Sequence, residues 1–266
     1  MTRKRKGIPP LLTTGLAATC GAMTNTAMTP TPKLEEDFYD WDERHQQVLE
    51  TIRTRKVEMV FIGDSITHLF GGVPRGNKCW GKAVWNRYYG SRNAVNLGFG
   101  WDRTQNVLWR LTHGELDGIQ PRAAVLLIGT NNRTGTANAR ENSPAEIADG
   151  IAAICRLIHE KAPACRIILV SVLPRGADAP SPAGLFVESI RDINRRIAGL
   201  ESLGYVTYLD LWPVFAQPDG TPKKVYMVDT VHLNAIGYQQ WAETMEPVLA
   251  GILKDTPIHP PTRRTA

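Results

Sequence analysis

The chain has 266 residues, with 42% hydrophobic and 21% charged side chains, which is ordinary for a globular protein able to bury a sizeable core. The formal net charge is +5, but residues 3–6 supply four of the positive charges, so the rest of the chain carries 27 basic against 26 acidic side chains. That near-neutral body argues against a nucleic-acid-binding protein, which would need a basic patch, and no later run approaches the roughly 18 apolar residues that span a membrane.

The first segment, residues 1–28, has the features of an export leader. A basic start is followed by GIPPLLTTGLAATCGAM, a modestly apolar stretch rich in small residues. The match is imperfect because Pro9, Pro10 and several threonines interrupt the stretch, and LAATC resembles a lipoprotein cleavage box only loosely. We expect an exported protein (periplasmic, secreted or lipid-anchored), with a disordered leader on a cytoplasmic protein as the alternative.

Residues 29–36, which include TPTPK, are expected to link this leader to a single domain at 37–254. The domain starts with a helical pattern of apolar residues at 37–56 that ends in basic side chains, as suits a helix C-terminus. Five short apolar runs then predict strands at 57–63, 94–99, 123–129, 166–173 and 206–212. The amphipathic segments between and after them predict helices at 103–111, 144–161, 185–203 and 235–253.

The helix at 144–161 has the clearest start signal, with Ser143 as N-cap, Pro144 at its first position and Glu146 in its first turn. Continuous apolar strands that alternate with helices predict a parallel sheet covered on both faces. We therefore expect an α/β fold, a single-domain three-layer α/β/α sandwich around a five-stranded parallel sheet, followed by a disordered tail at 255–266. A doubly wound sheet places functional groups just beyond the carboxyl ends of its strands.

Polar side chains stand at several of these expected strand ends. Ser65 follows the first strand and Asn131 the third, while Asp229 and His232 precede the last helix in VDTVHLNAIGY. Each has an ordinary explanation alone, as a turn, cap or partly buried residue. Together they supply the nucleophile, base, orienting acid and oxyanion donor that acyl transfer requires. The three-residue spacing lets one loop carry both the acid and the histidine, with the carboxylate on Nδ1–H and Nε2 facing the serine.

Four ordered segments, GDSIT, NLGFGWDRT, GTNN and DTVH, resemble the four sequence blocks of the GDSL-type, or SGNH, hydrolases. Within that family, GWDRTQNVLWRLTHGELDGIQP, VLLIGTNN and LPRG resemble the platelet-activating-factor acetylhydrolase catalytic-subunit branch. The resemblance covers roughly residues 57–250. It implies a flavodoxin-like sandwich and the activity of a serine esterase, lipase, thioesterase or carbohydrate deacetylase. The absence of G-x-S-x-G around Ser65 argues against an ordinary α/β-hydrolase.

Carried over residue by residue, the resemblance makes Ser65 the nucleophile and its backbone N–H one oxyanion donor. Asn131 would add a side-chain donor, and Asp229 and His232 would complete a triad. The second block departs from the family, which usually has glycine where this chain has Trp101. The backbone N–H of Trp101 can still serve as a donor, with Gly100 as the alternative, but the indole would narrow the site or form one wall of an acyl pocket.

Other residues are given structural roles. Asp64 is expected to accept backbone N–H bonds and hold its loop, while Arg110 either pairs with a carboxylate or lies on the surface. His45, His68, His113 and His159 are expected to be structural. Four aromatic residues between the first two strands are expected in the core, with a substrate groove as the alternative: Trp80, Trp85, Tyr88 and Tyr89. The four cysteines form no CxxC pair and are expected to be free thiols.

The sequence therefore predicts a serine esterase that hydrolyses short-chain, above all acetyl, esters through an acyl-enzyme on Ser65. No cofactor and no metal are expected, because side chains supply the chemistry. The expected partner is a small-molecule or carbohydrate ester; lipid-esterase, lysophospholipase-type or platelet-activating-factor-acetylhydrolase-like activity is the alternative, and a noncatalytic ligand-binding domain is less favoured. The sequence leaves the oligomeric state open, with a homodimer among the alternatives.

Overall fold

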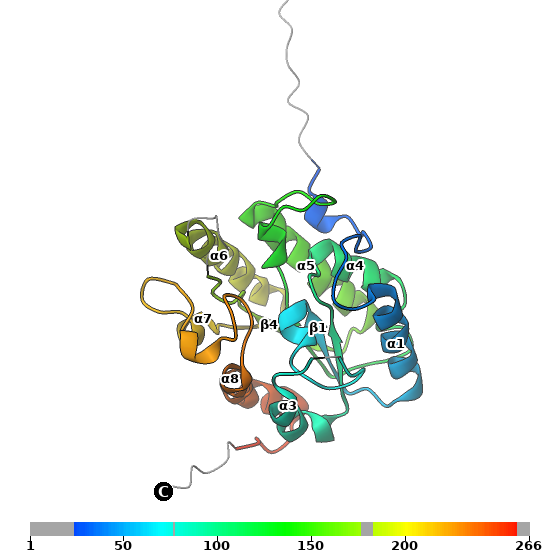
Figure 1. Ribbon diagram of the computed structural model, residues 1–266. Coiled ribbons are helices and arrows are strands. Elements are labelled where there is room, and N and C mark those ends of the chain that lie inside the picture. Colours follow the sequence, from blue (N-terminus) through cyan, green and yellow to red (C-terminus); the bar gives the residue numbers. More distant parts are fainter. Residues whose placement is uncertain (1–23, 77, 177–182, 260–266) are drawn as a thin grey trace, which may run out of the picture.

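Five apolar runs form five parallel strands of one sheet. The computed structural model describes residues 24–76, 78–176 and 183–259 (Figure 1). Its strands are β1 (Met59–Gly63), β2 (Ala94–Gly98), β3 (Ala123–Leu127), β4 (Arg166–Val170) and β5 (Val206–Leu209). They pair in the order β2-β1-β3-β4-β5, and Gly63 of β1 lies level with Gly98 of β2 and Leu127 of β3. The three strand ends therefore deliver their following residues to one edge of the sheet.

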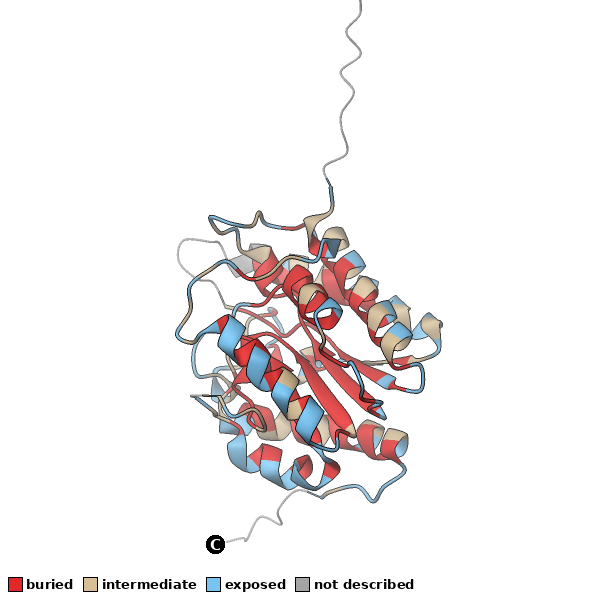
Figure 2. Cartoon of the chain, turned by 90° about the vertical axis from the view of Figure 1, so that its right-hand side faces the viewer, coloured by how far each residue is buried: buried red, intermediate tan, exposed pale blue. Residues whose placement is uncertain are grey.

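Helices cover both faces of the sheet, which confirms the three-layer α/β sandwich expected from the sequence (Figures 1 and 2). One face packs against α1 (Trp41–Thr54), α4 (Thr104–Thr112), α5 (Pro144–Lys161) and α6 (Ala183–Ala198), and the other against α3 (Lys82–Tyr88) and α8 (Ala235–Leu253). Strand side chains alternate between the two cores: Val60 and Ile62 join the first, Met59 and Phe61 the second. All five residues of β1, β2 and β3 are buried, as a sheet covered on both faces requires.

Local signals account for the helices whose bounds agree with expectation. Before α5, Ser143 and Glu146 form a reciprocal capping box, in which the Glu146 N–H donates to Ser143 Oγ (3.2 Å) and the Ser143 N–H to Glu146 Oε2 (2.9 Å). Asn234 caps α8 by accepting the Gly237 N–H (2.9 Å). The helix expected at 185–203 instead ends as α6 at Ala198 and continues as the 3₁₀ segment η4 (Gly199–Leu203).

Several short elements were not expected from the sequence. Besides α3, they include two single-turn helices, α2 (Ser65–His68) and α7 (Trp212–Phe215). The remaining ones are 3₁₀ turns: η1 (Thr26–Met28), η2 (Gly90–Arg92), η3 (Asn131–Arg133) and η5 (Lys224–Tyr226). Four aromatic residues precede the second strand. Trp85 and Tyr88 of α3 and the following Tyr89 are buried in the core, whereas Trp80 is only partly buried.

Both ends of the described chain contact the body of the domain. From residue 24 the chain packs on the helical layer: Ala27 is fully buried, its carbonyl accepts the Thr104 hydroxyl (2.8 Å), and Asn106 Nδ2 donates to the Thr31 carbonyl (3.0 Å). At the other end, Asp255 pairs with Arg92 (2.8 Å). The expected leader falls mainly on residues 1–23, outside the described residues. Among the helices of the described part, none has the length and apolar character needed to cross a bilayer.

Candidate active site

Ser65 is presented at the carboxyl end of β1 as the first residue of α2. Asp64 is the N-cap of this short helix, and its Oδ1 accepts the Ile66 N–H (2.9 Å), the loop-holding role expected for it. Gly63 has to be glycine, because a Cβ there would lie 2.3 Å from both the Leu127 carbonyl oxygen and Thr67 Oγ1. The serine is thus fixed on a tight strand-to-helix turn.

A loop before α8 brings His232 and Asp229 to this serine, 167 residues away in the chain. His232 Nε2 lies 2.9 Å from Ser65 Oγ, and His232 Nδ1 lies 2.7 Å from Asp229 Oδ2. A carboxylate accepts the Nδ1 proton, so the network places the unprotonated Nε2 against the serine hydroxyl. Trp80 packs edge-on against the imidazole at 5.7 Å between ring centroids.

The other oxygen of Asp229 holds the loop together. Asp229 Oδ1 accepts the backbone N–H groups of Val231 (2.8 Å) and His232 (2.7 Å). Partial burial raises the pKa of Asp229, but these two N–H bonds and the His232 ring outweigh burial and leave the pKa below its usual value. The carboxylate is therefore ionised at neutral pH and able to stabilise a charged imidazole.

Asn131 stands at the start of η3, just beyond β3, and is buried. Its Nδ2 donates to the backbone carbonyl of Asp102 (3.0 Å), which orients the amide. An amide nitrogen carries two protons, and the second has no acceptor among the described residues. That proton is available as a hydrogen-bond donor at the edge of the sheet shared with Ser65.

Trp101 lies in a turn formed by residues 99–102 and closed by a hydrogen bond from the Asp102 N–H to the Phe99 carbonyl (3.3 Å). Trp101 has φ +60°, a left-handed conformation that glycine adopts readily and a bulky residue rarely does. The indole is 47% exposed, so it stands at the rim of the site rather than in the core. Within the described residues, the Trp101 N–H has no hydrogen-bond partner.

Gly100, the alternative donor expected from the sequence, uses its N–H elsewhere. It donates to Nδ1 of His68 (3.3 Å), one turn of α2 after Ser65. Burial lowers the pKa of His68 to about 2, with the Arg44 and Lys33 charges adding to the effect, so the ring stays neutral and Nδ1 remains an acceptor. His68, which lacks a companion acid and was expected to be structural, therefore supports the turn beside Ser65.

A buried ionic cluster contacts the turn at residues 99–102 through Phe99 and Asp102. Arg110 is fully buried, donates from Nε to Asp102 Oδ2 (2.8 Å), pairs with Glu115, and lies over the Phe99 ring at 3.9 Å from its centroid. Trp41 Nε1 donates to the other Asp102 oxygen (2.8 Å). Of the two roles considered for Arg110, pairing with a carboxylate is the one observed. A buried ion pair of this kind is by itself weak evidence for added stability.

Asp64 gives a prediction about stability. Burial raises the pKa of Asp64 to about 7, so the folded state holds this proton more tightly than the unfolded chain does. The resulting stabilisation is complete below pH about 4 and is lost as the pH rises to about 7. We expect the free energy of unfolding of the wild type, relative to Asp64→Asn, to fall by up to about 4 kcal/mol between pH 4 and pH 8 in urea titrations.

The comparison with Asp64→Asn cancels the titration of groups that do not interact with Asp64. The Asp102 charge raises the pKa of Asp64, and burial raises the pKa of Asp102 to about 6, so this residue contributes to the same pH-dependent difference. Asp219→Asn is the control, because that carboxylate is exposed and hydrogen bonds from Thr221 lower its pKa. A wild-type to Asp64→Asn difference that does not change with pH would show that Asp64 ionises normally in the folded state.

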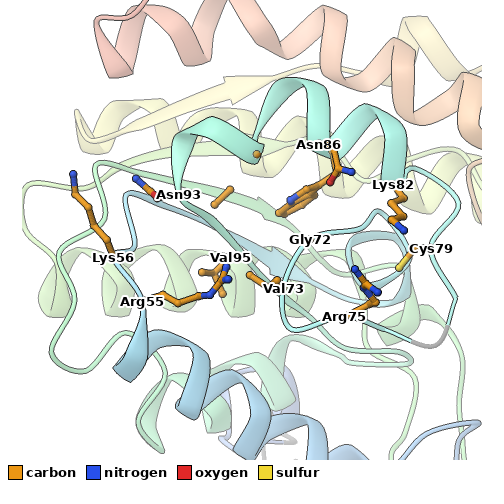
Figure 3. A pocket seen from close by; sticks show the side chains of 13 residues that line it. Arg55, Lys56, Gly72, Val73, Arg75, Cys79, Lys82, Asn86, Asn93 and Val95 are labelled. Carbon is orange, nitrogen blue, oxygen red and sulfur yellow. The ribbon is translucent and has the colours of Figure 1, made fainter.

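Of the hollows in the described part of the chain, one is separate from the serine–histidine contact and another adjoins it. One of about 500 Å³ opens beside α3, the end of α1 and the edge strand β2 (Figure 3). Among the described residues, its lining holds no carboxylate and four cationic side chains: Arg55, Lys56, Arg75 and Lys82. Neither Ser65 nor His232 lines it, so it is separate from the serine–histidine contact. The second, of about 510 Å³, is lined by Asp229 together with Met227, Val228 and Gly176, and adjoins the acid side of the site.

Comparison with known proteins shows which proteins the chain is similar to. Residues 61–240 match the model of the GDSL-like lipase/acylhydrolase family. The chain is 32% identical over 235 residues to platelet-activating factor acetylhydrolase IB subunit alpha1 of Bos taurus, an alignment that covers 86% of this chain and 91% of the bovine protein. Its fold is similar to that of a GDSL-like lipase from Bacteroides thetaiotaomicron (TM-score 0.60, 17% identity, 81% of this chain and 99% of the other). It is also similar to Est24, a carbohydrate acetylesterase from Sinorhizobium meliloti (TM-score 0.55, 16% identity, 74% and 100%).

Proposed function

Because this chain belongs to the GDSL-like lipase/acylhydrolase family, we propose that it is a serine esterase that hydrolyses acetyl and other short-chain esters. The observation that carries the proposal is the hydrogen-bonded chain from Ser65 Oγ through His232 to Asp229, with distances of 2.9 and 2.7 Å. This arrangement activates a serine hydroxyl, which is a weak nucleophile by itself.

In the proposed reaction, His232 Nε2 takes the proton of Ser65 as Oγ attacks the ester carbonyl carbon. The oxyanion that forms accepts hydrogen bonds from the Ser65 N–H, the Trp101 N–H and the Asn131 amide. His232 then gives its proton to the departing alcohol, which leaves the acyl group on Oγ. A water molecule, deprotonated by His232, attacks the acyl-enzyme; the carboxylic acid departs and Ser65 regains its proton.

The preference for acetyl groups is supported by the names of two similar proteins and by the rim of the site. The bovine relative is named an acetylhydrolase and the Sinorhizobium neighbour an acetylesterase, although their alcohol groups differ. In this chain Trp101, 47% exposed, stands where the family usually has glycine, and we propose that its indole limits the length of the acyl chain. An acetylated carbohydrate or small ester is our first candidate, and an acetylated lipid is the alternative.

A substrate panel separates these alternatives. With p-nitrophenyl acetate, butyrate and octanoate, we expect kcat/KM to fall as the acyl chain lengthens. Acetylated xylan and an acetyl glycerophospholipid then compare the two classes of alcohol. A rate that rises toward octanoate would contradict the short-chain proposal. A noncatalytic domain is tested independently, because it would leave Ser65 unlabelled by a fluorophosphonate that modifies activated serines.

Asn131→Ala tests the oxyanion donor. Removing one such donor typically costs about 10²–10³ in turnover, so kcat should fall by this factor while KM changes little. The matched control is Asn194→Ala, which removes another buried side-chain amide, one on α6 whose bonds to the Val172 backbone (2.8 and 2.9 Å) are structural. We expect Asn194→Ala to lower the melting temperature more than the rate. If Asn131→Ala kept a rate within threefold of wild type, Asn131 would be only a turn residue.

Export also remains a proposal, based on the basic start and small apolar residues of the leader. Asn25 caps η1, and Ala27 is buried against the domain. We therefore propose that any cleavage falls before Asn25, since a cut at residue 28 would remove contacts made by the folded chain. N-terminal sequencing of the protein from the exported and cytoplasmic fractions of its own host tests this.

A further inference from the structure

The peptide group between Gly100 and Trp101 accepts a hydrogen bond at its carbonyl oxygen, on the side opposite its N–H. The Tyr39 hydroxyl donates to the Gly100 carbonyl oxygen (3.1 Å). Carbonyl and N–H point in opposite directions in a trans peptide, so this bond orients the Trp101 N–H as well. Tyr39 lies just before α1, in the N-terminal segment that packs over the turn.

The contact between this segment and the turn is close. A Cβ on Gly100 would lie 2.8 Å from Asp37 Oδ2 and 2.9 Å from Tyr39 Cε1. Asp37 is in turn held by Lys33 through a buried ion pair (2.7 Å), and the Tyr39 ring packs edge-on against His68 (4.8 Å). Burial raises the pKa of the Tyr39 hydroxyl well above its usual value, so the group stays protonated and donates at any working pH.

Trp101 makes such a restraint necessary. With φ +60° at the third position of the turn, the backbone has the sign that a type II turn requires, for which glycine is preferred. Rotating the central peptide would give a type I turn, in which the third residue has negative φ, a conformation that tryptophan adopts without strain. That rotation would reverse the direction of the Trp101 N–H and withdraw it from the oxyanion.

We propose that Tyr39 is a positioning residue, whose hydrogen bond to the Gly100 carbonyl keeps the Trp101 N–H directed at the oxyanion and so replaces the conformational preference of the glycine that the family usually has there. The inference rests on the proposed function for its catalytic meaning. The orientation of the peptide itself does not depend on that function. The segment before α1 therefore belongs to the site, although it is remote from Ser65 in the chain.

The first test is a double-mutant cycle on p-nitrophenyl acetate. Tyr39→Phe should lower kcat roughly tenfold with KM little changed, since one neutral hydrogen bond is removed and its effect is felt in the transition state. In a Trp101→Gly background the same change should cost less than about threefold, because glycine holds positive φ without help. Tyr89→Phe is the matched control, because that buried hydroxyl has no partner among the described residues and its loss should leave kcat unchanged.

The second test is the crystal structure of Tyr39→Phe beside that of the wild type. We expect φ of Trp101 to be positive in the wild type and negative in the variant. Equal losses in both backgrounds, no loss in the wild-type background, or a Trp101 that keeps positive φ without the hydroxyl would each overturn the proposal. If the wild type hydrolysed no ester and Ser65 took up no fluorophosphonate, the proposed function would fail, and the two crystal structures would still decide whether Tyr39 sets this peptide.

Discussion

Replacing Ser65 by alanine is expected to lower kcat for p-nitrophenyl acetate by about 10⁴- to 10⁶-fold, because no other group in the site can form the acyl-enzyme. The fold should be unaffected: Asp64, not Ser65, caps α2, and alanine is a good helix former. Rates of purified wild type and variant, with melting temperatures alongside, measure both effects. The residual rate should match hydrolysis assisted only by binding and the oxyanion donors.

His232→Ala provides the second arm of this experiment. Ser65 and His232 act as one unit through their 2.9 Å contact, so the double variant should be no slower than either single one. His113→Ala is the matched control, since that exposed histidine stacks on Trp109 away from the site and should keep the wild-type rate. If losses in the two single variants multiplied in the double variant, the residues would act in separate steps.

The elements that could be predicted from the sequence depend on contacts between residues that are close in the chain. The bounds of α5 follow from Ser143, Pro144 and Glu146, whose capping contacts involve only neighbouring residues. The strands were located correctly but overestimated in length, because an apolar run extends beyond the residues that pair in the sheet. The expected strand at 94–99, for example, ends at Gly98; the Phe99 N–H still donates to the Gly63 carbonyl (3.0 Å), but Phe99 has no paired residue on β1.

The helices that were missed depend on long-range contacts. In α3, the aromatic side chains have no strong helical preference, and the element is stabilised by packing against α8 and the sheet. The segment at 29–36 contains prolines and threonines typical of a linker, yet Asn106 of α4 donates to the Thr31 carbonyl, and Thr104 of α4 donates to the carbonyl of Ala27 just before this segment. The local sequence does not indicate such distant partners.

The candidate site divides in the same way. Ser65, Asn131, Asp229 and His232 could be named because each occupies a strand-end or loop position with distinctive chemistry. Tyr39 and His68 could not, because their relevance lies only in which backbone group of the turn they contact. Trp101 was recognised as a departure from the family, but its positive φ, which makes the departure consequential, is visible only in the folded chain.

Asp229→Asn is expected to lower kcat by about 10⁴-fold without unfolding the loop. The asparagine carbonyl can still accept the N–H groups of Val231 and His232 that Asp229 Oδ1 now accepts. Its amide, however, presents a donor where Oδ2 now accepts from His232 Nδ1. The histidine would then carry its proton on Nε2, facing Ser65, and could not take up the serine proton.

The chain offers a close control for this substitution in Asp219, whose Oδ1 accepts the Thr221 N–H (2.9 Å) in the same local turn that Asp229 makes with Val231, but with no histidine beyond it. Asp219→Asn should keep the rate within twofold, so a loss confined to Asp229→Asn cannot come from the turn. Stopped-flow or steady-state assays at pH 7 with both variants measure the difference. If Asp229→Asn lost less than tenfold, the carboxylate would serve only to close its loop, and the imidazole would be oriented by its contacts with Ser65 and Trp80 alone.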